Sequence, residues 1–225
     1  MTEIYIVRHC EAEGNTSGFF QGITDCGITE RGQLQLELLK ERFHNINLDV
    51  IYTSPLKRTM LTAEAVQGGR DIEIIKEPEI IEINAGDMEG KLWSELPVLY
   101  PDTYSLWESD IGAFQAPNGE STRDVYKRMK QAITRIAQDN RGKTVAVVTH
   151  GCAVYMLMSF IHGYSEEEIG KRAFWSKNTS VSLVNFDEDM KPEVVLFNDD
   201  SHISENENAS ARPMKWLSEG YGKTK

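Results

Sequence analysis

Thr144-Val145-Ala146-Val147-Val148-Thr149-His150-Gly151 is the stretch that decides the fold. Its first five residues form an apolar, β-branched run of the kind that is buried between two layers of helices. A polar turn with a glycine follows at once, and then an apolar helical segment from about Cys152 to His162. A strand, a turn and a helix in this order are typical of an α/β layered domain. The polar turn also argues against a membrane-spanning helix over residues 145–164.

The alternation of strands and helices continues on both sides of this stretch. Short runs of β-branched residues predict strands over residues 4–7, 50–53, 72–76, 181–186 and 194–197. Helical spacing of apolar residues predicts a helix over residues 29–44 with Thr29 as its N-cap. Ser54-Pro55 is expected to open another helix as cap and N1 residue, and Gly68-Gly69 is expected to close it.

Later in the chain, Ser121 is expected to cap a strong helix. Its apolar face is formed by residues at helical spacing, namely Val125, Met129, Ala132 and Ile136. Ser165 followed by Glu166-Glu167-Glu168 predicts a capping box and a helix start.

Length and charge limit what the chain can be. Its 225 residues correspond to a single domain over residues 1–225. Residues 91–118 have no clean period and are expected to be an insertion with short helices. Residues 201–225 are expected to be a polar tail with Trp216 as an anchor. With 24 Lys+Arg against 35 Asp+Glu, the net charge of −11 argues against nucleic acid and anionic membranes as partners.

The cysteines and the N-terminus indicate the compartment. Cys10, Cys26 and Cys152 are too few, and odd in number, for a disulfide framework. The first residues, Met1 to Arg8, carry a glutamate where a signal peptide needs basic residues. We therefore expect a cytoplasmic protein.

Four groups of chemically competent residues fall just beyond predicted strand ends, where open α/β sheets bind ligands. They are Arg8-His9-Cys10-Glu11, Arg58, Glu82 and His150-Gly151. Two arginines can orient phosphoryl oxygens, a neutral imidazole can attack phosphorus, and a carboxyl group can protonate a leaving alcohol. The set suits a phosphate monoester.

These residues also lie in five ordered motifs. They comprise residues 8–15 (Arg8-His9-Cys10-Glu11 through Asn15), 21–32 (from Gln21-Gly22 to Gly32), 54–64, 81–90 and 148–151. Together they resemble the motifs of the histidine phosphatase (phosphoglycerate mutase-like) superfamily. The resemblance implies a three-layer α/β/α sandwich with a mostly parallel central sheet.

The resemblance also implies roles for these residues. His9 would attack the substrate phosphorus while Arg8, Arg58 and His150 hold the phosphoryl oxygens. Glu82 would act as the acid and then the base, with Glu89 as the rival for this role. The remaining substrate contacts would come from Asn15, Gln21 and Gly22. No metal and no cofactor are implied, and the partner would be a small phosphorylated substrate, with a homodimer left open.

Within the family, the pattern favours a phosphatase of the histidine acid type, a phosphoric monoester hydrolase. Glu89-Gly90-Lys91-Leu92-Trp93 lacks the longer insertion of the phosphoglycerate mutases, and residues 117–121 resemble an element of the shorter phosphatases. Phosphoglycerate mutase-type phosphoryl transfer is the alternative. The sequence does not name the substrate, although the Trp and Tyr residues of 91–118 would either wall the pocket or pack in the core.

Cys10 departs from the family pattern, which has glycine at this position. Its side chain would either crowd the turn that presents His9 or require a small backbone adjustment. A compromised turn would leave a catalytically weak phosphate-binding regulatory protein, a further alternative. Because Cys10 and Cys152 flank the two histidines, a redox-sensitive site and a zinc site are also conceivable, but buried inert thiols are favoured.

Overall fold

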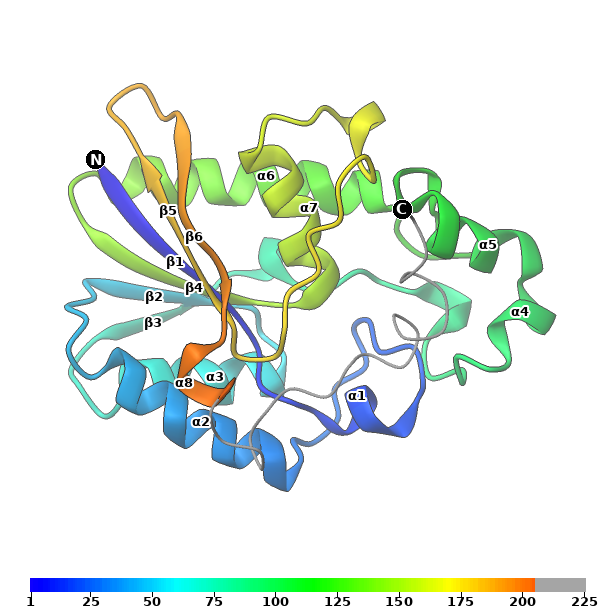
Figure 1. The fold of residues 1–225 in the computed structure, drawn as a ribbon, viewed down its shortest axis with the longest axis horizontal. Coiled ribbons are helices and arrows are strands. Elements are labelled where there is room, and N and C mark those ends of the chain that lie inside the picture. Colours follow the sequence, from blue (N-terminus) through cyan, green and yellow to red (C-terminus); the bar gives the residue numbers. More distant parts are fainter. Residues whose placement is uncertain (205–225) are drawn as a thin grey trace.

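The computed structural model describes residues 1–204, and its centre is a six-stranded sheet in the order β3-β2-β4-β1-β5-β6 (Figure 1). The strands are β1 (Thr2–Arg8), β2 (Val50–Thr53), β3 (Glu73–Lys76), β4 (Thr144–Thr149), β5 (Val181–Phe186) and β6 (Pro192–Asp199). The first four strands of this order are parallel, and β5 and β6 are antiparallel to their neighbours. All six predicted strands are confirmed, with small differences at their ends.

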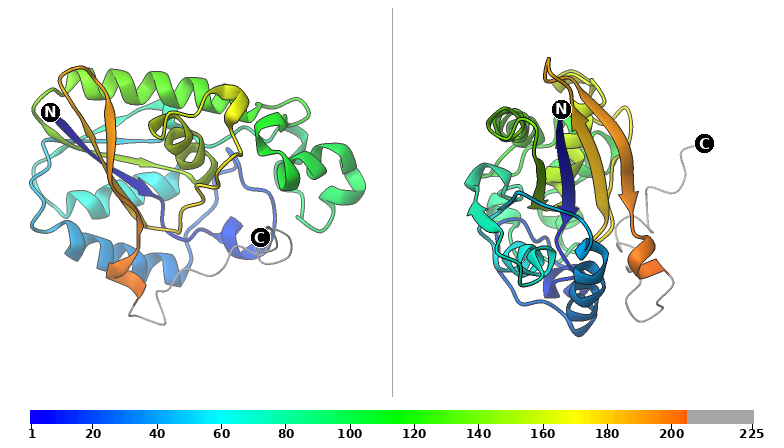
Figure 2. Two further views of the ribbon diagram at one scale, coloured as in Figure 1. Left: turned by 45° about the horizontal axis from the view of Figure 1, so that its top comes forward. Right: turned by 90° about the vertical axis from the view of Figure 1, so that its left-hand side faces the viewer.

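Helices cover both faces of the sheet. They are α1 (Glu13–Ser17), α2 (Glu30–Phe43), α3 (Lys57–Gln67), α4 (Leu96–Leu99), α5 (Pro101–Ser109), α6 (Thr122–Asp139), α7 (Gly151–Ile161) and α8 (Ser201–Ser204). Short 3₁₀ turns are η1 (Pro78–Ile80), η2 (Gly86–Met88), η3 (Ile111–Ala113) and η4 (Glu166–Glu168). Figures 1 and 2 show α6 and α7 on one side of the sheet and α2 and α3 on the other.

The side chains of β4 show why two layers of helices are needed. Val145 and Val147 pack in the core under α6 and α7, whereas Ala146 and Val148 pack in the core under α2 and α3. Because successive residues of a strand point to opposite faces, a wholly apolar strand needs an apolar layer on each side. The predicted three-layer α/β/α sandwich with a mostly parallel sheet is confirmed.

Two predicted helix starts are confirmed in atomic detail. The Thr29 hydroxyl accepts the backbone N–H of Gly32 at the start of α2, and the Ser121 hydroxyl accepts that of Asp124 at the start of α6. The four residues predicted to form the apolar face of α6 are all buried. At Ser165, by contrast, the capping box opens the single turn η4 and no α-helix follows it.

The predicted start of α3 is wrong. The helix begins at Lys57, and its N-cap residue Leu56 supplies no side-chain hydrogen bond. Instead the carboxylate of Asp25, from a distant segment, accepts the backbone N–H of Lys57 at 2.9 Å. Ser54 is used elsewhere, because its hydroxyl lies 2.7 Å from Nε2 of His150. The end of the helix at Gly68, with a φ of 63°, agrees with the prediction.

The segment expected as an insertion, residues 91–118, contains α4, α5 and η3. Figure 1 shows α4 and α5 at one end of the molecule, beyond the carboxyl ends of the parallel strands. A bridge between Phe19 and Leu92 joins this segment to the loop after α1. In the segment expected as a tail, residues 201–204 form α8 and Ile203 is buried, whereas residues 205–225, including Trp216, lie outside the described residues.

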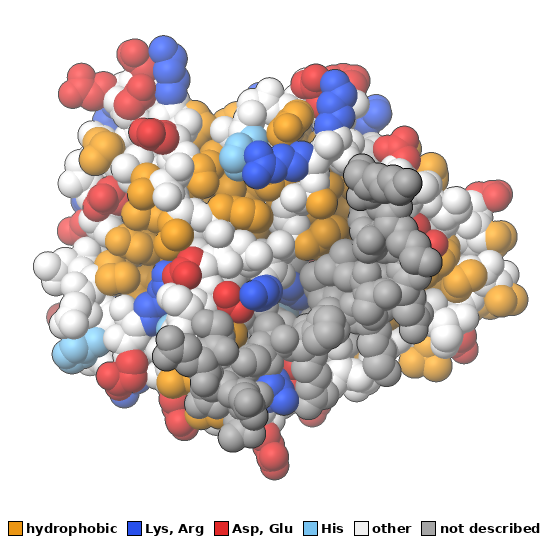
Figure 3. Space-filling model, in the orientation of Figure 1, with side chains coloured by type: hydrophobic (Ala, Val, Ile, Leu, Met, Phe, Trp, Pro, Cys, Tyr) orange, Lys and Arg blue, Asp and Glu red, His pale blue; other side chains and the backbone are white. Residues whose placement is uncertain are grey.

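On the face shown in Figure 3, acidic and basic side chains are scattered around a central area of hydrophobic ones. No helix within residues 1–204 is long and apolar enough to cross a membrane.

Candidate active site

The carboxyl ends of β1 and β4 bring two histidines together. Arg8, the last residue of β1, is the register partner of Thr149, the last residue of β4. His9 and His150 follow these partners directly, and their ring centroids lie 5.2 Å apart. Both side chains are buried. The parallel pairing of two strands therefore builds the pair from positions 141 residues apart in the sequence.

The hydrogen bond of His9 determines its tautomer. Its Nδ1 lies 2.6 Å from the backbone carbonyl oxygen of Cys10. A carbonyl oxygen can only accept, so Nδ1 carries the proton and Nε2 keeps its lone pair. Burial, together with the Arg58 and Arg8 guanidinium groups, holds the pKa of His9 well below its usual value. His9 is thus a neutral imidazole with an unprotonated Nε2.

His150 is held as the opposite tautomer. Nε of Arg58 donates to its Nδ1 at 3.2 Å, so its Nε2 carries the proton and donates to the Ser54 hydroxyl at 2.7 Å. Burial, with Arg58 and His9 as further causes, holds the pKa of His150 well below its usual value. Sequence reasoning did not identify Ser54 as a partner of this histidine.

Arg58 is almost fully buried, with 1% of its surface exposed. Besides its bond to His150, it donates to the backbone carbonyls of Gly22 at 2.7 Å and Thr24 at 2.9 Å. Burial lowers the pKa of Arg58. Gly22, which was predicted to contact the substrate, therefore accepts a hydrogen bond from Arg58 through its own carbonyl oxygen.

The loop around Gly22 is fixed by Glu89. Its carboxylate accepts the backbone N–H groups of Gly22, Ile23, Thr24 and Ala85 and the hydroxyl of Thr24. A β-carbon at Gly22 would come within 2.1 Å of this carboxylate and 2.2 Å of the Ile83 carbonyl, so only glycine fits. Glu89, the rival of Glu82, is thus engaged in holding a loop.

Glu82 lies at the N-terminus of α7. Its carboxylate accepts the backbone N–H groups of Cys152 and Ala153, each at 3.1 Å, and that of Ile83 at 3.0 Å. The first turn of a helix offers such N–H groups and favours an anion. The side chain is 7% exposed.

The ion pair between Arg128 and Glu120 holds the backbone around Glu82. Arg128 of α6 donates to the carbonyl oxygens of Glu79 at 2.8 Å, Ile81 at 2.6 Å and Glu82 at 3.1 Å. It also pairs with both oxygens of Glu120, at 2.9 and 3.1 Å. Glu120 in turn accepts the backbone N–H of Asn84 at 2.8 Å. Arg128 and Glu120 together fix the backbone of residues 79–84 through these hydrogen bonds.

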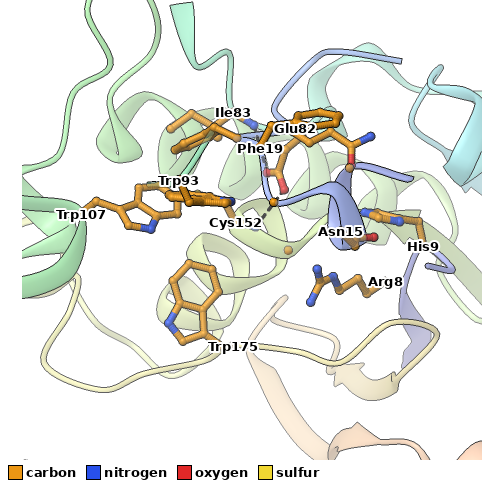
Figure 4. A pocket seen from close by; sticks show the side chains of 15 residues that line it. Arg8, His9, Asn15, Phe19, Glu82, Ile83, Trp93, Trp107, Cys152 and Trp175 are labelled. Atoms are coloured by element: carbon orange, nitrogen blue, oxygen red, sulfur yellow. Dashed lines mark hydrogen bonds between the residues drawn. The ribbon is translucent and has the colours of Figure 1, made fainter. Parts of the chain in front are cut away.

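A pocket connects these groups (Figure 4). Its lining includes five of the predicted site residues, which are Arg8, His9, Asn15, Gln21 and Glu82. Arg58, His150 and Gly22 are not among the lining residues. They lie behind His9 and hold one another through the hydrogen bonds described above. That Arg58 and His150 contact a phosphoryl group stays a prediction.

Arg8 is held by the loop before β5. Its guanidinium donates to the carbonyl oxygen of Ser176, and burial lowers its pKa to about 10. Asn178, from the same loop, donates to the carbonyl oxygen of His9 at 3.0 Å. This loop before β5 carried no motif in the sequence, and its role in supporting the site was missed.

The other end of the pocket is aromatic. Trp93 and Trp107 line it, as one of the two interpretations of residues 91–118 predicted, and Trp107 also packs in the core. Phe19, Phe20 and Trp175 complete this end. None of these three was predicted, because they come from loops whose spacing carries no periodic signal.

Cys10 is accommodated without strain. Its side chain is fully buried, its backbone N–H donates to the Thr62 hydroxyl at 3.1 Å, and it is not among the described non-glycine residues with positive φ. Burial raises the pKa of the Cys10 thiol to about 12 and raises that of Cys152 well above its usual value. Both thiols are therefore protonated and unreactive.

The donor sets argue against the alternative zinc site. Within residues 1–204, no three His, Cys, Asp or Glu side chains gather in a way that would hold a metal ion. One ring nitrogen of His9 and one of His150 already take part in hydrogen bonds within the protein.

Comparisons with known proteins identify the relatives of this chain. The sequence model of the "Histidine phosphatase superfamily (branch 1)" matches residues 4–200. Phosphoserine phosphatase 1 from Hydrogenobacter thermophilus is 35% identical over 191 residues, which cover 84% of this chain and 88% of that protein. Among solved structures, Bacillus stearothermophilus YhfR is 31% identical with a TM-score of 0.85, covering 90% of this chain and 100% of its own.

A second solved structure is a mutant phosphoserine phosphatase from Entamoeba histolytica in complex with phosphoserine. It is 27% identical, with a TM-score of 0.77, and the match covers 90% of this chain and 100% of that chain. The matched residues 4–200 include every site residue predicted from the sequence.

Proposed function

This chain belongs to branch 1 of the histidine phosphatase superfamily and hydrolyses phosphate monoesters through a phosphohistidine, and we propose that His9 carries the phosphoryl group. The observation that supports His9 most directly is the hydrogen bond from its Nδ1 to the Cys10 carbonyl oxygen. That bond leaves Nε2 unprotonated and aimed by the backbone rather than by a second side chain.

In the first step, Nε2 of His9 attacks phosphorus and the bond between phosphorus and the ester oxygen breaks. Arg8, in the pocket wall, neutralises charge on the phosphoryl oxygens, and Asn15 and Gln21 border them. Arg58 and His150 lie behind His9, where the charge of Arg58 helps to keep the His9 ring neutral before the attack. Glu82 enters this step protonated and gives its proton to the leaving alcohol oxygen, and the backbone N–H groups at the start of α7 then stabilise the carboxylate that forms.

In the second step, water attacks phosphorus and the bond to His9 breaks. Glu82 takes the proton of the water, inorganic phosphate leaves, and His9 returns to its neutral form. The position of Glu82 in the pocket wall, and the engagement of Glu89 in a loop, support Glu82 over its rival.

The proposal includes the narrower class of a histidine acid-type phosphatase. It is supported by the low pKa of His9, because a nucleophile that stays unprotonated below neutrality still reacts in acid. A cytoplasmic location is also proposed, on the ground that all three cysteines are free.

A trapping experiment tests the role of His9. The protein is mixed with a monoester labelled in its phosphoryl group and quenched in base, and acid-labile label is expected on His9. His9→Ala should carry no label, whereas His44→Ala, which removes an exposed histidine, should carry as much as the unchanged protein. Absence of label and of released phosphate with several monoesters would instead support a phosphate-binding regulatory protein.

Two substrate questions follow from the relatives. Their names suggest phosphoserine as a candidate substrate. Incubation with 3-phosphoglycerate distinguishes hydrolysis from mutase-type transfer. We expect release of inorganic phosphate to be faster than formation of 2-phosphoglycerate. The reverse order would identify a mutase.

A further inference from the structure

The end of the pocket away from the phosphoryl site is a wall of rings. This aromatic wall consists of Phe19, Phe20, Trp93, Trp107 and Trp175. Figure 4 shows Trp93 and Trp107 at the side of the pocket opposite His9 and Arg8. An alcohol part long enough to cross the pocket would reach this wall when phosphorus lies at His9.

Four rings of the aromatic wall pack against one another, namely Phe20, Trp93, Trp107 and Trp175. Phe20 stacks on Trp93 with ring centroids 4.6 Å apart and meets Trp107 at 5.0 Å. Trp107 is fixed to the core by Phe114 at 4.8 Å, and Trp175 rests on Tyr155 at 4.9 Å. Rings held in this way are already ordered, so binding a flat apolar group against them costs little conformational entropy.

The charges of the pocket are confined to its phosphoryl end. Among the described residues that line it, Arg8 is the only lysine or arginine, and Glu82 is the only acidic residue. Both belong to the proposed reaction. A substrate with a carboxylate of its own, such as phosphoserine, would place a second anion in this pocket, where the one cation of the described lining, Arg8, is already engaged by the phosphoryl group. Burying unpaired charges is costly.

We propose that the alcohol part of the substrate is a planar, apolar ring system that stacks on the aromatic wall, and that small zwitterionic monoesters are poor substrates. The inference rests on the proposed function, because it requires the phosphoryl group to lie at His9. It names a different substrate class from the one that the relatives' names suggest.

The test compares monoesters of primary alcohols, so that all leaving groups are alkoxides and differ mainly in the attached body. They are 2-phenylethyl phosphate, 2-cyclohexylethyl phosphate, ethyl phosphate and phosphoserine. Binding to His9→Ala is measured by calorimetry, and hydrolysis by the unchanged protein is measured as phosphate release. We expect 2-phenylethyl phosphate to bind about 10-fold more tightly than ethyl phosphate, with phosphoserine weakest. The cyclohexyl ester should fall between the phenyl and ethyl esters, because it is apolar but not flat.

Variants test whether the aromatic wall is responsible. Trp93→Ala and Trp175→Ala are each combined with His9→Ala for the binding measurements. Each should weaken the binding of 2-phenylethyl phosphate about 10-fold and the binding of ethyl phosphate much less. Tyr100→Ala removes a half-buried ring from the same segment that is not among the lining residues, and it should leave the order of ligands unchanged.

The two failures are distinguishable. Tighter binding or faster hydrolysis of phosphoserine than of the phenyl ester would overturn the inference and leave the proposed hydrolysis intact. Equal loss for all ligands in the tryptophan variants would also overturn it. If the phenyl ester binds tightly to His9→Ala but the unchanged protein hydrolyses none of the monoesters, the proposed function fails and the subsite stands.

Discussion

A single backbone carbonyl decides the chemical state of His9. The Cys10 carbonyl oxygen accepts a hydrogen bond from the protonated Nδ1, and the two nearby guanidinium groups oppose any further proton on the ring. A buried imidazole surrounded by positive charge stays neutral and nucleophilic. The residue that departs from the family pattern therefore contributes through its backbone, while its side chain is buried and its φ is not positive.

The two buried histidines predict acid sensitivity of the fold. Their pKa values are lower in the folded than in the unfolded protein, so below about pH 6.5 the unfolded state binds more protons. The free energy of unfolding should then fall as pH falls, by up to about 1.4 kcal/mol per pH unit for each histidine. Urea denaturation at pH 7.5 and 5.5 measures this.

Replacement of His150 provides the comparison for that experiment. His150→Gln should show a smaller loss of stability between the two pH values than the unchanged protein, whereas His44→Gln should show the same loss, because His44 is exposed. An unchanged pH dependence in His150→Gln would contradict the account of its buried, neutral state.

Glu82 is the second residue whose role can be isolated. Glu82→Gln keeps a hydrogen-bond acceptor at the start of α7 but removes the proton donor. We expect hydrolysis of alkyl phosphates to fall by about 10²- to 10⁴-fold, and that of 4-nitrophenyl phosphate by much less, because its leaving group needs no proton. Glu79→Gln, at an exposed glutamate three residues away, is the control. Equal loss for both substrate types would contradict the acid role.

At the scale of elements, α6 acts on the site from a distance through Arg128. This side chain and Glu120 bond four backbone groups of residues 79–84, the segment that carries Glu82. Arg128→Ala should therefore lower kcat for alkyl phosphates by about 10- to 100-fold, with the same dependence on leaving group as Glu82→Gln.

Two variants separate positioning from general damage. Arg128→Lys should recover part of the activity, because an ammonium group can still reach some of the carbonyl oxygens. Lys127→Ala removes an exposed partner of Glu166 and should have no effect. Loss of activity in Arg128→Ala that is equal for good and poor leaving groups would mean that the pair only stabilises the fold.

Elements were predictable where their signals are local. The caps Thr29 and Ser121 act within three residues of themselves, and the sequence predicted both helices. The start of α3 was not predictable in this way, because Asp25 supplies the cap from another segment and Ser54 serves His150 instead. A side chain that the sequence suggests for a local cap can thus serve a distant residue in the structure instead.

For the whole molecule, the motifs predicted which residues gather at the site, but not which of them line the pocket and which lie behind its wall. Arg8, His9 and Glu82 reach the pocket because parallel strands end at one edge of the sheet. That Arg58 and His150 lie behind His9, and that Trp175 closes the aromatic wall, depends on side-chain packing between distant segments. Such packing leaves no periodic trace in a single sequence.

The complete fold also protects the thiols. Cys10 and Cys152 are buried, whereas Cys26 is partly exposed. A thiol reagent should modify one cysteine of the folded protein quickly and all three in concentrated urea, and Cys26→Ser should abolish the fast reaction. Fast modification of Cys10 or Cys152 with loss of activity would instead support a redox-sensitive site.

The position of β1 within the sheet has a consequence for biosynthesis. The first strand of the chain lies between β4 and β5, whose residues are 144–149 and 181–186. During translation, at about 5–20 residues per second, the ribosome must add every residue from 9 to 143 after β1 before β4 begins to emerge. Until then Ile4, Ile6 and Val7 have no sheet to join, and His9 has no partner strand beside it. His9 therefore leaves the ribosome well before the strand that places His150 next to it.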